Sequence, residues 1–298
     1  GSTGRPKGVM TTDRNVVNYV DAFTKRIPLS EHDTVLQVVS FSFDAFSEEV
    51  YPILSCSGRL VISRKVSDLN IDELVKTINK HRVTLVSCSP LLLNEIDKNQ
   101  HLTFHPQMKF ISGGDVLKFE YVEHIIKGAD VYNSYGPTEA TVCATYYQLS
   151  SADRKKTSIP IGKPLSNYKV YIADQYGRPQ PVGIPGELLI GGEGIARGYL
   201  NHETLTKAAF VLDEAGERVY RTGDLARWLP DGNIEFLGRI DNQVKIRGYR
   251  IELEEIEHKL LKNGDINEVI VVAKEDQENS KYLCLSLIHI SEPTRQAE

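Results

Sequence analysis

The first eight residues, which read GSTGRPKG, combine glycines, hydroxyl groups and two cations in one short segment. Glycine lets backbone N–H groups approach phosphate oxygens closely, hydroxyls add hydrogen-bond donors, and Lys7 adds positive charge. The segment is not a P-loop, because Gly8 and Val9 follow Lys7 where that motif requires Ser or Thr at the start of a helix. Taken alone, this pattern indicates either a phosphate-binding loop or a surface turn.

Four further motifs follow in order along the chain. They read NSYGPTE at 133–139, GEL at 186–188 with GG at 191–192 and ARGY at 196–199, YRTGD at 220–224, and GRIDNQVKIRG at 238–248. Together with the first segment they resemble the core motifs of the adenylate-forming superfamily, which includes acyl-CoA synthetases, luciferases and the adenylation domains of nonribosomal peptide synthetases. Each motif is weak alone, but their order extends the resemblance over nearly all of residues 1–284.

The elements that would position these motifs begin with repeated β–α units. We expect Asp13 to cap a first helix, strands over 34–39, 59–62, 83–86, 109–111 and 130–132, and helices over 46–54, 71–80, 91–96 and 118–126. Such repeats indicate a mostly parallel sheet with helices on both faces, which is an α/β fold.

The pattern changes after about residue 145 and again near residue 241. Short strands over 169–173, 186–190, 218–220 and 234–236 lie between Gly and Pro turns, with Asp231-Gly232-Asn233 as a hairpin turn. A strand over 243–246, a helix over about 254–261 that stops at Gly264, and a strand over 268–273 follow. We therefore expect the α/β part of a large domain over 1–145, a β-rich, barrel-like subdomain over 146–240, and the start of a small α+β domain over 241–284.

The two ends of the chain carry separate expectations. Residues 285–295 read LSLIHISEPTR, which resembles the translated end of a common sequencing adaptor, so we interpret 285–298 as an artefact. The alternative is a natural strand followed by a polar tail. We also expect the front of the large domain and the end of the small domain to be missing, which would leave this chain with little or no adenylation activity.

The bulk composition is that of a globular protein. The chain has 298 residues, 41% hydrophobic and 25% charged, and a net charge of -5, which gives no reason to expect nucleic acid or an anionic membrane as partner. No apolar run reaches the ~18 residues of a membrane span. The four cysteines are Cys56, Cys88, Cys143 and Cys284. Their spacing is typical neither of a metal site nor of disulfide bonds, which favours a reduced, cytoplasmic setting.

The resemblance implies that a carboxylate is joined to the α-phosphate of ATP with release of pyrophosphate. Because two anions must meet, the site needs cations, a metal and backbone donors. The resemblance implies that the phosphates are held by Ser2, Thr3, Gly4 and Lys7. It makes Lys7, Thr138 and Glu139 catalytic, with Thr138 on the α-phosphate and Glu139 on Mg²⁺, a cation suited to a carboxylate beside phosphates.

The resemblance also implies roles in nucleotide binding and domain motion for other positions of the same motifs. Tyr135 would stack on adenine, while Asp224 and Arg239 would reach the ribose. Asn133 and Gly136 would belong to the same nucleotide site. Asp241 would be a hinge for the small domain, and a loop carrying Lys245, Arg247 and Gly248 would serve the second step, transfer to the phosphopantetheine thiol of a carrier protein.

The segment Phe43-Asp44-Ala45 matches the family segment in which an aspartate binds the α-ammonium group of an amino acid. The implied pocket then comprises Asp44, Ala45, Glu48, Ser87, Ile111, Gly113, Ser134, Val142 and Cys143. Apart from Asp44, which would bind the α-ammonium group, most of these positions are small or neutral and Glu48 is the exception; a carboxylate deep in a side-chain pocket is costly unless paired. A substrate with a terminal cation would pair it, so the set resembles a lysine pocket, with ornithine next. The alternative is that Glu48 faces solvent on a polar helix face.

Three functions remain open at this point. The first is an amino-acid adenylation domain with carrier and condensation domains of the same synthetase as partners. The second is an acyl- or aryl-CoA synthetase of the same superfamily, against which Asp44 and Glu48 argue. The third is a non-catalytic nucleotide-binding fragment.

Overall fold

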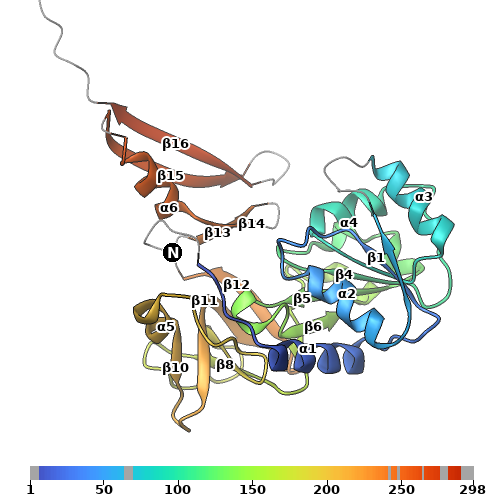
Figure 1. Cartoon of the computed structure of the whole chain (residues 1–298), viewed down its shortest axis with the longest axis horizontal. Coiled ribbons are helices and arrows are strands. Elements are labelled where there is room, and N and C mark those ends of the chain that lie inside the picture. The colour runs from blue at the N-terminus through green and yellow to red at the C-terminus, as the bar shows by residue number, and fades with distance from the viewer. Residues whose placement is uncertain are drawn as a thin grey trace, which may run out of the picture. The chain divides into compact units, whose positions relative to one another are not determined.

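The computed structural model describes residues 7–63, 70–240, 243–246, 249–263, 265–275 and 281–289 (Figure 1). The chain divides into two compact units: residues 9–240, and residues 1–8 together with 241–298. In the described part of the chain, no helix combines the length and the apolar character that crossing a bilayer requires.

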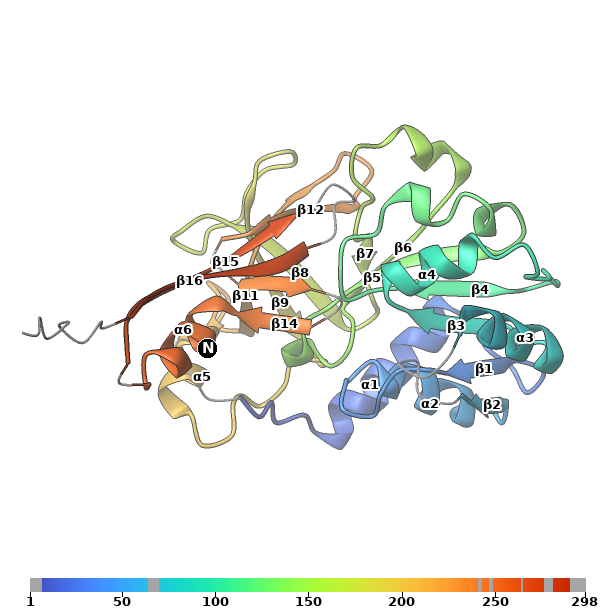
Figure 2. The same cartoon turned by 90° about the horizontal axis from the view of Figure 1, so that it is seen from above.

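The first unit begins with a seven-stranded sheet, whose neighbouring strands β1, β3, β4 and β5 can be followed in Figure 2. The strands are β1 (Thr34–Gln37), β2 (Arg59–Ile62), β3 (Leu85–Cys88), β4 (Lys109–Ser112), β5 (Asp130–Tyr135), β6 (Thr145–Gln148) and β7 (Lys163–Pro164). Their order is β2-β1-β3-β4-β5-β6-β7. The pairs among the first five are parallel, and β6 and β7 add antiparallel strands at one edge.

Helices cover both faces of this sheet, as the sequence predicts. They are α1 (Asp13–Arg26), α2 (Phe46–Ser55), α3 (Ile71–His81) and α4 (Pro90–Asp97). Side chains alternate between the faces of a strand. Val35 and Leu85 accordingly pack in one core with residues of α1 and α2, while their neighbours Leu36 and Val86 pack in another with α3 and α4.

The second sheet of this unit is antiparallel and five-stranded. It contains β8 (Tyr168–Ala173), β9 (Gly186–Gly192), β10 (Phe210–Leu212), β11 (Arg218–Trp228) and β12 (Ile234–Arg239), and α5 (Glu203–Ala209) precedes β10. The strand order is β10-β11-β9-β8, with β12 paired to β11. The predicted turn at 231–233 joins β11 to β12, and there the Asn233 N–H donates to Asp231 Oδ1 at 3.0 Å. Because β6 and β7 belong to the first sheet, the second sheet begins only at β8. One apolar core extends through both sheets.

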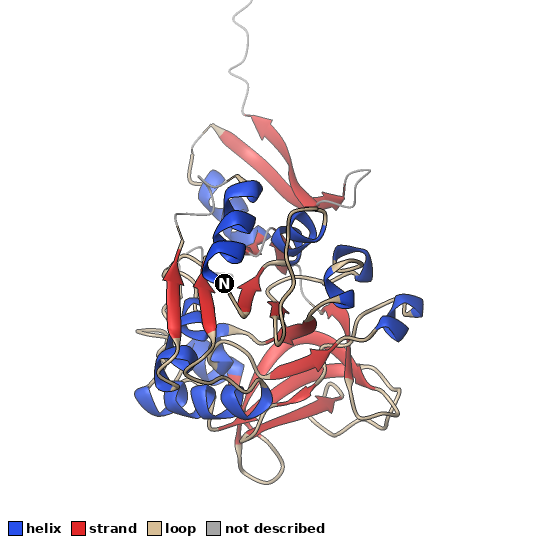
Figure 3. Ribbon diagram, turned by 90° about the vertical axis from the view of Figure 1, so that its right-hand side faces the viewer, coloured by secondary structure: helices blue, strands red, loops and turns tan. Residues whose placement is uncertain are grey.

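The described residues of the second unit form two hairpins and one helix, with strands in red and the helix in blue in Figure 3. They are β13 (Gln243–Ile246) with β14 (Tyr249–Glu252), α6 (Leu253–Leu260), and β15 (Ile266–Glu275) with β16 (Lys281–His289). Residues 285–289, which we excluded from the fold as an artefact, end β16, where Leu285 pairs with Val271. An alternating apolar segment can complete such a ladder whatever its origin. Gly264 lies outside the described residues.

Three local predictions differ from the structure. Thr12, not Asp13, caps α1, because its hydroxyl accepts the Asn15 N–H. The strand expected over 83–86 is displaced to Leu85–Cys88. In place of the helix expected over 118–126 there are two 3-10 turns, at Phe119–Tyr121 and Ile125–Lys127. The carboxylate of Asp97 accepts the N–H groups of His124 and Ile125, so these amides cannot bond within one continuous helix. Two further 3-10 turns span Thr138–Ala140 and Ser151–Lys155.

Glu49 in the first turn of α2 anchors the end of β1. Its carboxyl group is buried and accepts hydrogen bonds from the backbone N–H groups of Val38, at 3.0 Å, and Val39, at 3.1 Å. It also accepts a hydrogen bond from the side-chain amide of Gln37 at 3.3 Å. Burial outweighs these hydrogen bonds and raises the pKa of Glu49 to about 8. The sequence reasoning assigned Glu49 no role, because a second glutamate beside Glu48 looks like an ordinary polar helix position.

The raised pKa of Glu49 predicts a pH-dependent stability. Between its ordinary value of 4.5 and about 8 the folded state holds a proton that the unfolded state has lost, so the free energy of unfolding falls as pH rises through this window. The slope for one proton is at most about 1.4 kcal/mol per pH unit. Urea titrations between pH 5 and 8 should show a flatter profile for Glu49→Gln, while Glu73→Gln, in the exposed first turn of α3, should keep the wild-type slope. An unchanged slope in Glu49→Gln would contradict this assignment.

Candidate active site

Three predicted nucleotide-binding residues meet where the two sheets join. The Tyr135 hydroxyl, at the end of β5, donates to Asp224 Oδ2, and Arg239 Nη1 donates to Asp224 Oδ1 at 2.9 Å. The register of β11 and β12 places Asp224 opposite Arg239. Burial and the adjacent Asp224 charge raise the pKa of Tyr135 well above its usual value, which keeps the phenol protonated as a donor. The Phe236 ring lies 6.2 Å from that of Tyr135, between ring centroids.

The segment after β5 brings a hydroxyl and two carboxylates together. Thr138 is exposed, whereas Glu139 is buried and accepts the Tyr199 hydroxyl on Oε1 at 2.6 Å. Burial raises the pKa of Asp44, and the charge of Glu139 acts in the same direction, while a hydrogen bond with the Thr138 side chain opposes them. Asp44, Thr138 and Glu139 therefore form one cluster, although they come from widely separated sequence motifs.

A strained turn follows this cluster. Thr141 and Val142 have φ values of 58° and 69°, a region that β-branched residues rarely adopt and that costs of order 1–3 kcal/mol per residue. The Thr141 hydroxyl donates to the Gly194 carbonyl at 2.8 Å, and the Tyr168 hydroxyl donates to the Ala140 carbonyl at 3.1 Å. These bonds, to Tyr168 on β8 and to Gly194 just after β9, hold the turn that carries Val142 of the expected pocket.

Glu48 lies inside the protein, with 2% of its surface exposed, so the solvent-facing alternative is wrong. Its Oε1 accepts the Ser87 hydroxyl at 2.6 Å, and its Oε2 accepts the hydroxyls of Tyr19, at 2.6 Å, and Tyr146. Burial, and to a lesser degree the charge of Asp44, raises the pKa of Glu48. Within the described ranges, no Lys, Arg or His forms an ion pair with this carboxylate.

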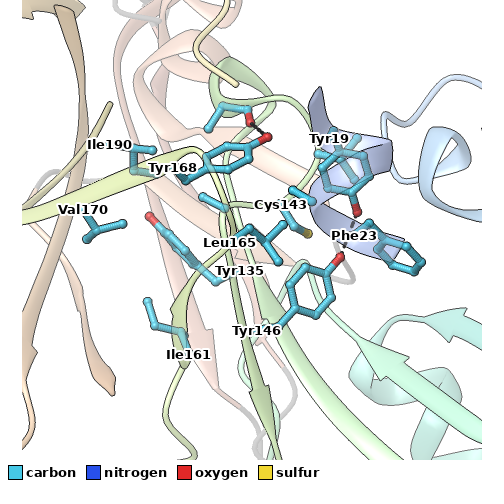
Figure 4. Packing of buried hydrophobic residues seen from close by; sticks show 14 of the residues in the cluster. Tyr19, Phe23, Tyr135, Cys143, Tyr146, Ile161, Leu165, Tyr168, Val170 and Ile190 are labelled. Atoms are coloured by element: carbon cyan, nitrogen blue, oxygen red, sulfur yellow. Dashed lines mark hydrogen bonds between the residues drawn. The ribbon is translucent and has the colours of Figure 1, made fainter. Parts of the chain in front are cut away.

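The sequence reasoning missed Tyr19 and Tyr146. Figure 4 shows the two rings pointing toward each other from α1 and β6, beside Cys143. Their hydroxyl oxygens are 2.8 Å apart. Both positions read as apolar core in the sequence, and no spacing signal connects them to Glu48, because they lie 29 and 98 residues from it.

Several other positions of the expected pocket lie close to one another. A Cβ built on Gly113 would lie 2.3 Å from Ser134 Oγ, so only glycine lets these two segments approach. Burial and the negative charge of Glu48 raise the pKa of the Cys143 thiol, which also hydrogen-bonds with Ser134. Ile111 is fully buried in the same core, and Ala45 directly precedes α2.

Some predicted residues are engaged elsewhere. The Asn133 side chain donates to the Pro160 carbonyl at 2.9 Å, which ties β5 to the segment before β7. A Cβ on Gly136 would lie 2.4 Å from the Cys143 Cα, so this glycine permits close backbone packing. Lys7 belongs to the second unit, where its Nζ donates to Glu252 Oε1 at 3.3 Å. The predicted residues outside the described ranges are Ser2, Thr3, Gly4, Asp241, Arg247 and Gly248.

The donor chemistry around Glu139 suits a hard cation. Asp44 and Thr138 add oxygen atoms near it, but the described residues contain no group of three His, Cys, Asp or Glu side chains that could hold a metal ion. Mg²⁺ commonly takes one or two carboxylates and fills its other positions with phosphate oxygens and water. The residues present therefore fit a metal that arrives with a nucleotide rather than a protein cage.

Comparison with known proteins places the chain in a family. The family model described as AMP-binding enzyme matches residues 1–200. Bacitracin synthase 2 from Bacillus licheniformis is 94% identical over 284 residues, which is 95% of this chain and 11% of that protein. Bacitracin synthase 1 from the same organism is 44% identical over 289 residues, covering 95% of this chain and 6% of that protein. The chain thus spans a small part of these synthetases.

Solved structures agree with this relation. NpsA-ThdA, an artificially fused adenylation-PCP di-domain NRPS from Klebsiella oxytoca, has a TM-score of 0.86 and 27% identity, over 97% of this chain and 58% of that one. The Vibrio cholerae adenylation domain AlmE, solved with glycyl-adenosine-5'-phosphate, has a TM-score of 0.83 and 29% identity, over 95% and 55% of the two chains. The chain therefore belongs to the AMP-binding enzyme family, and it is similar to the adenylation domains of nonribosomal peptide synthetases.

Proposed function

We propose that the chain is a portion of a peptide synthetase domain, and that this domain activates L-lysine with ATP and Mg²⁺ as an aminoacyl-adenylate for transfer to the phosphopantetheine thiol of a carrier domain. The observation that carries the choice of lysine is Glu48, a buried carboxylate among described residues that offer it hydroxyls but no cation. A terminal ammonium group would supply the missing charge. Ornithine, one methylene shorter, is the next candidate.

The other pocket carboxylate suits the α-ammonium group of an amino acid. Asp44 lies beside Thr138 and Glu139, so an amino acid held there would present its own carboxylate toward the nucleotide phosphates. A fatty acid carries no ammonium group, so it would leave both buried carboxyl groups, Asp44 and Glu48, without the cationic partner that an amino acid with a cationic side chain supplies. This argues against the acyl-CoA synthetase alternative.

The nucleotide would lie across the junction of the two sheets. Asp224 has the two carboxylate oxygens that can accept both ribose hydroxyls, and Tyr135 and Arg239 hold it in place. Thr138 would donate to the α-phosphate and Glu139 would bind Mg²⁺, which, when present, would offset charge on the phosphates. The other phosphates would be contacted by Lys7 together with Ser2, Thr3 and Gly4. Asn133 and Gly136 would hold the backbone around the nucleotide site in place.

Transfer to a carrier would be the second step. In support, two of the similar structures join adenylation and PCP domains in one chain. We place the hinge at Asp241, where the second compact unit begins, and the loop of Lys245, Arg247 and Gly248 would act after rotation. A condensation domain would complete the set of partners.

Lysine preference is tested by calorimetric binding of non-hydrolysable aminoacyl-adenylate analogues to the chain, with lysyl, ornithyl, glutaminyl and leucyl forms. We expect the lysyl analogue to bind most tightly. Glu48→Gln should weaken it by roughly 10²-fold or more, because an unpaired buried ammonium costs about 3–5 kcal/mol, and should spare the leucyl analogue. Glu73→Gln is the matched surface control. ATP–pyrophosphate exchange by the parent synthetase should follow the same order, and a leucine or glutamine preference would refute the assignment.

Nucleotide binding is tested at Asp224. Asp224→Asn should weaken ATP binding about 10- to 100-fold, since hydrogen bonds to charged groups contribute about 1.5–3 kcal/mol. ATP that lacks ribose hydroxyls should bind the wild type weakly, and its affinities for the wild type and for Asp224→Asn should be similar. Asp231→Asn, in the exposed hairpin turn, should leave the Kd unchanged. Equal losses for ATP and its deoxy form would show that Asp224 acts on something other than the ribose.

A further inference from the structure

Three oxygen atoms in the pocket form a closed triangle. Glu48 Oε2 lies 2.6 Å from the Tyr19 hydroxyl, the two tyrosine hydroxyls are 2.8 Å apart, and the Tyr146 hydroxyl is hydrogen-bonded to the same Oε2. All three residues are fully or almost fully buried. Ser87 donates to the other carboxyl oxygen, Oε1, at 2.6 Å, so its hydrogen is not available to the triangle.

The hydrogen atoms of this triangle can be counted. Each tyrosine hydroxyl has one hydrogen to donate, and an ionised carboxylate has none. Three contacts at hydrogen-bonding distance need three hydrogens, whereas two tyrosines and a carboxylate supply two. A proton on Glu48 would supply the third, and each oxygen would then donate once and accept once around the ring.

The electrostatic surroundings agree with this count. The titratable groups that influence Glu48 are Asp44, Glu49, Cys143, Tyr19 and Tyr146. All of them are acids, and Asp44 is the one whose charge raises the pKa of Glu48. Burial therefore acts in the same direction as this neighbour, and among the described residues no cation pairs with Glu48.

We propose that, before substrate binds, Glu48 carries a proton that closes a hydrogen-bonded ring with Tyr19 and Tyr146, and that a cationic side chain entering the pocket displaces this proton to solvent. The inference rests on the proposed lysine pocket and deepens it. The step is balanced: a neutral carboxyl group and an ammonium ion become a carboxylate paired with the ammonium ion, and one proton leaves to the buffer. Tyr19 and Tyr146 are then positioning residues that set how readily Glu48 ionises.

This arrangement has a consequence for specificity. A neutral side chain can enter without removing the proton, so its binding releases none. A lysine side chain must remove it, so lysine affinity should rise with pH by up to roughly tenfold per pH unit. This rise should extend over the pH range in which Glu48 is protonated in the free protein and ionised in the complex. Leucine affinity should not follow that slope.

The protonation state can be tested without any substrate. Infrared difference spectra of the chain at pH 6, wild type minus Glu48→Gln, should contain the C=O stretch of a protonated carboxyl group, because an ordinary glutamate would be ionised at that pH. Tyr19→Phe, which removes one member of the ring, should shift the frequency of that stretch. Finding only carboxylate bands for Glu48 would overturn the proposal.

Proton release separates this inference from the proposed function. Calorimetry of the lysyl-adenylate analogue at pH 6 in two buffers of different ionisation enthalpy should show about one proton released, against none for the leucyl analogue. Tyr19→Phe and Tyr146→Phe should move the rise of lysine affinity to higher pH, because each removes a donor that stabilises the ionised form of Glu48. The control Tyr51→Phe, on the exposed surface of α2, should not.

Tight lysine binding without proton release would refute this inference and leave the proposed function standing. Failure of lysine to bind better than leucine would refute the proposed function, and the infrared result would still decide the protonation state.

Discussion

Two adjacent carboxylates at the start of α2 connect the fold to the site. Glu48 and Glu49 are both buried, yet their partners differ. Glu49 accepts the backbone N–H groups that follow β1, whereas Glu48 accepts hydroxyls from α1, β3 and β6. A helix N-terminus is favourable for negative charge, but burial outweighs this and the hydrogen bonds, and it raises the pKa of both groups. The segment between β1 and α2, which carries Asp44, is thereby held from its two ends.

The parallel sheet brings the rest of the pocket to the same place. In such sheets ligands bind beyond the carboxyl ends of the strands. Asp44 follows β1, Ser87 lies near the end of β3, Gly113 follows β4 and Ser134 lies near the end of β5. The β–α connections at this edge therefore converge where the proposed pocket would lie, although their residues are spread over some 90 positions of the sequence.

The antiparallel sheet completes the site from the other side. Its strands carry Asp224 and Arg239, and the connection that follows β9 carries Tyr199, which donates to Glu139, and Gly194, whose carbonyl accepts the Thr141 hydroxyl in the strained turn. One apolar core extends through both sheets and supports these contacts. Four buried tyrosines are hydrogen-bonded to carboxyl groups, and burial is the main cause that raises the pKa of their phenols; they are Tyr19, Tyr135, Tyr146 and Tyr199.

The sequence alone determined the family, the α/β architecture, most strands and helices, and the residues that converge near Asp44 and Asp224, because ordered motifs and hydrophobic periodicity are local patterns. It failed where a tertiary contact overrides a local pattern: Asp97 divides the expected helix over 118–126, and β6 and β7 join the first sheet. Only the tertiary structure decided that Glu48 is buried and that Tyr19 and Tyr146 enclose it. A carboxylate's environment is set by side chains far away in sequence, and apolar periodicity cannot distinguish a tyrosine that packs in the core from one whose hydroxyl also holds a charge.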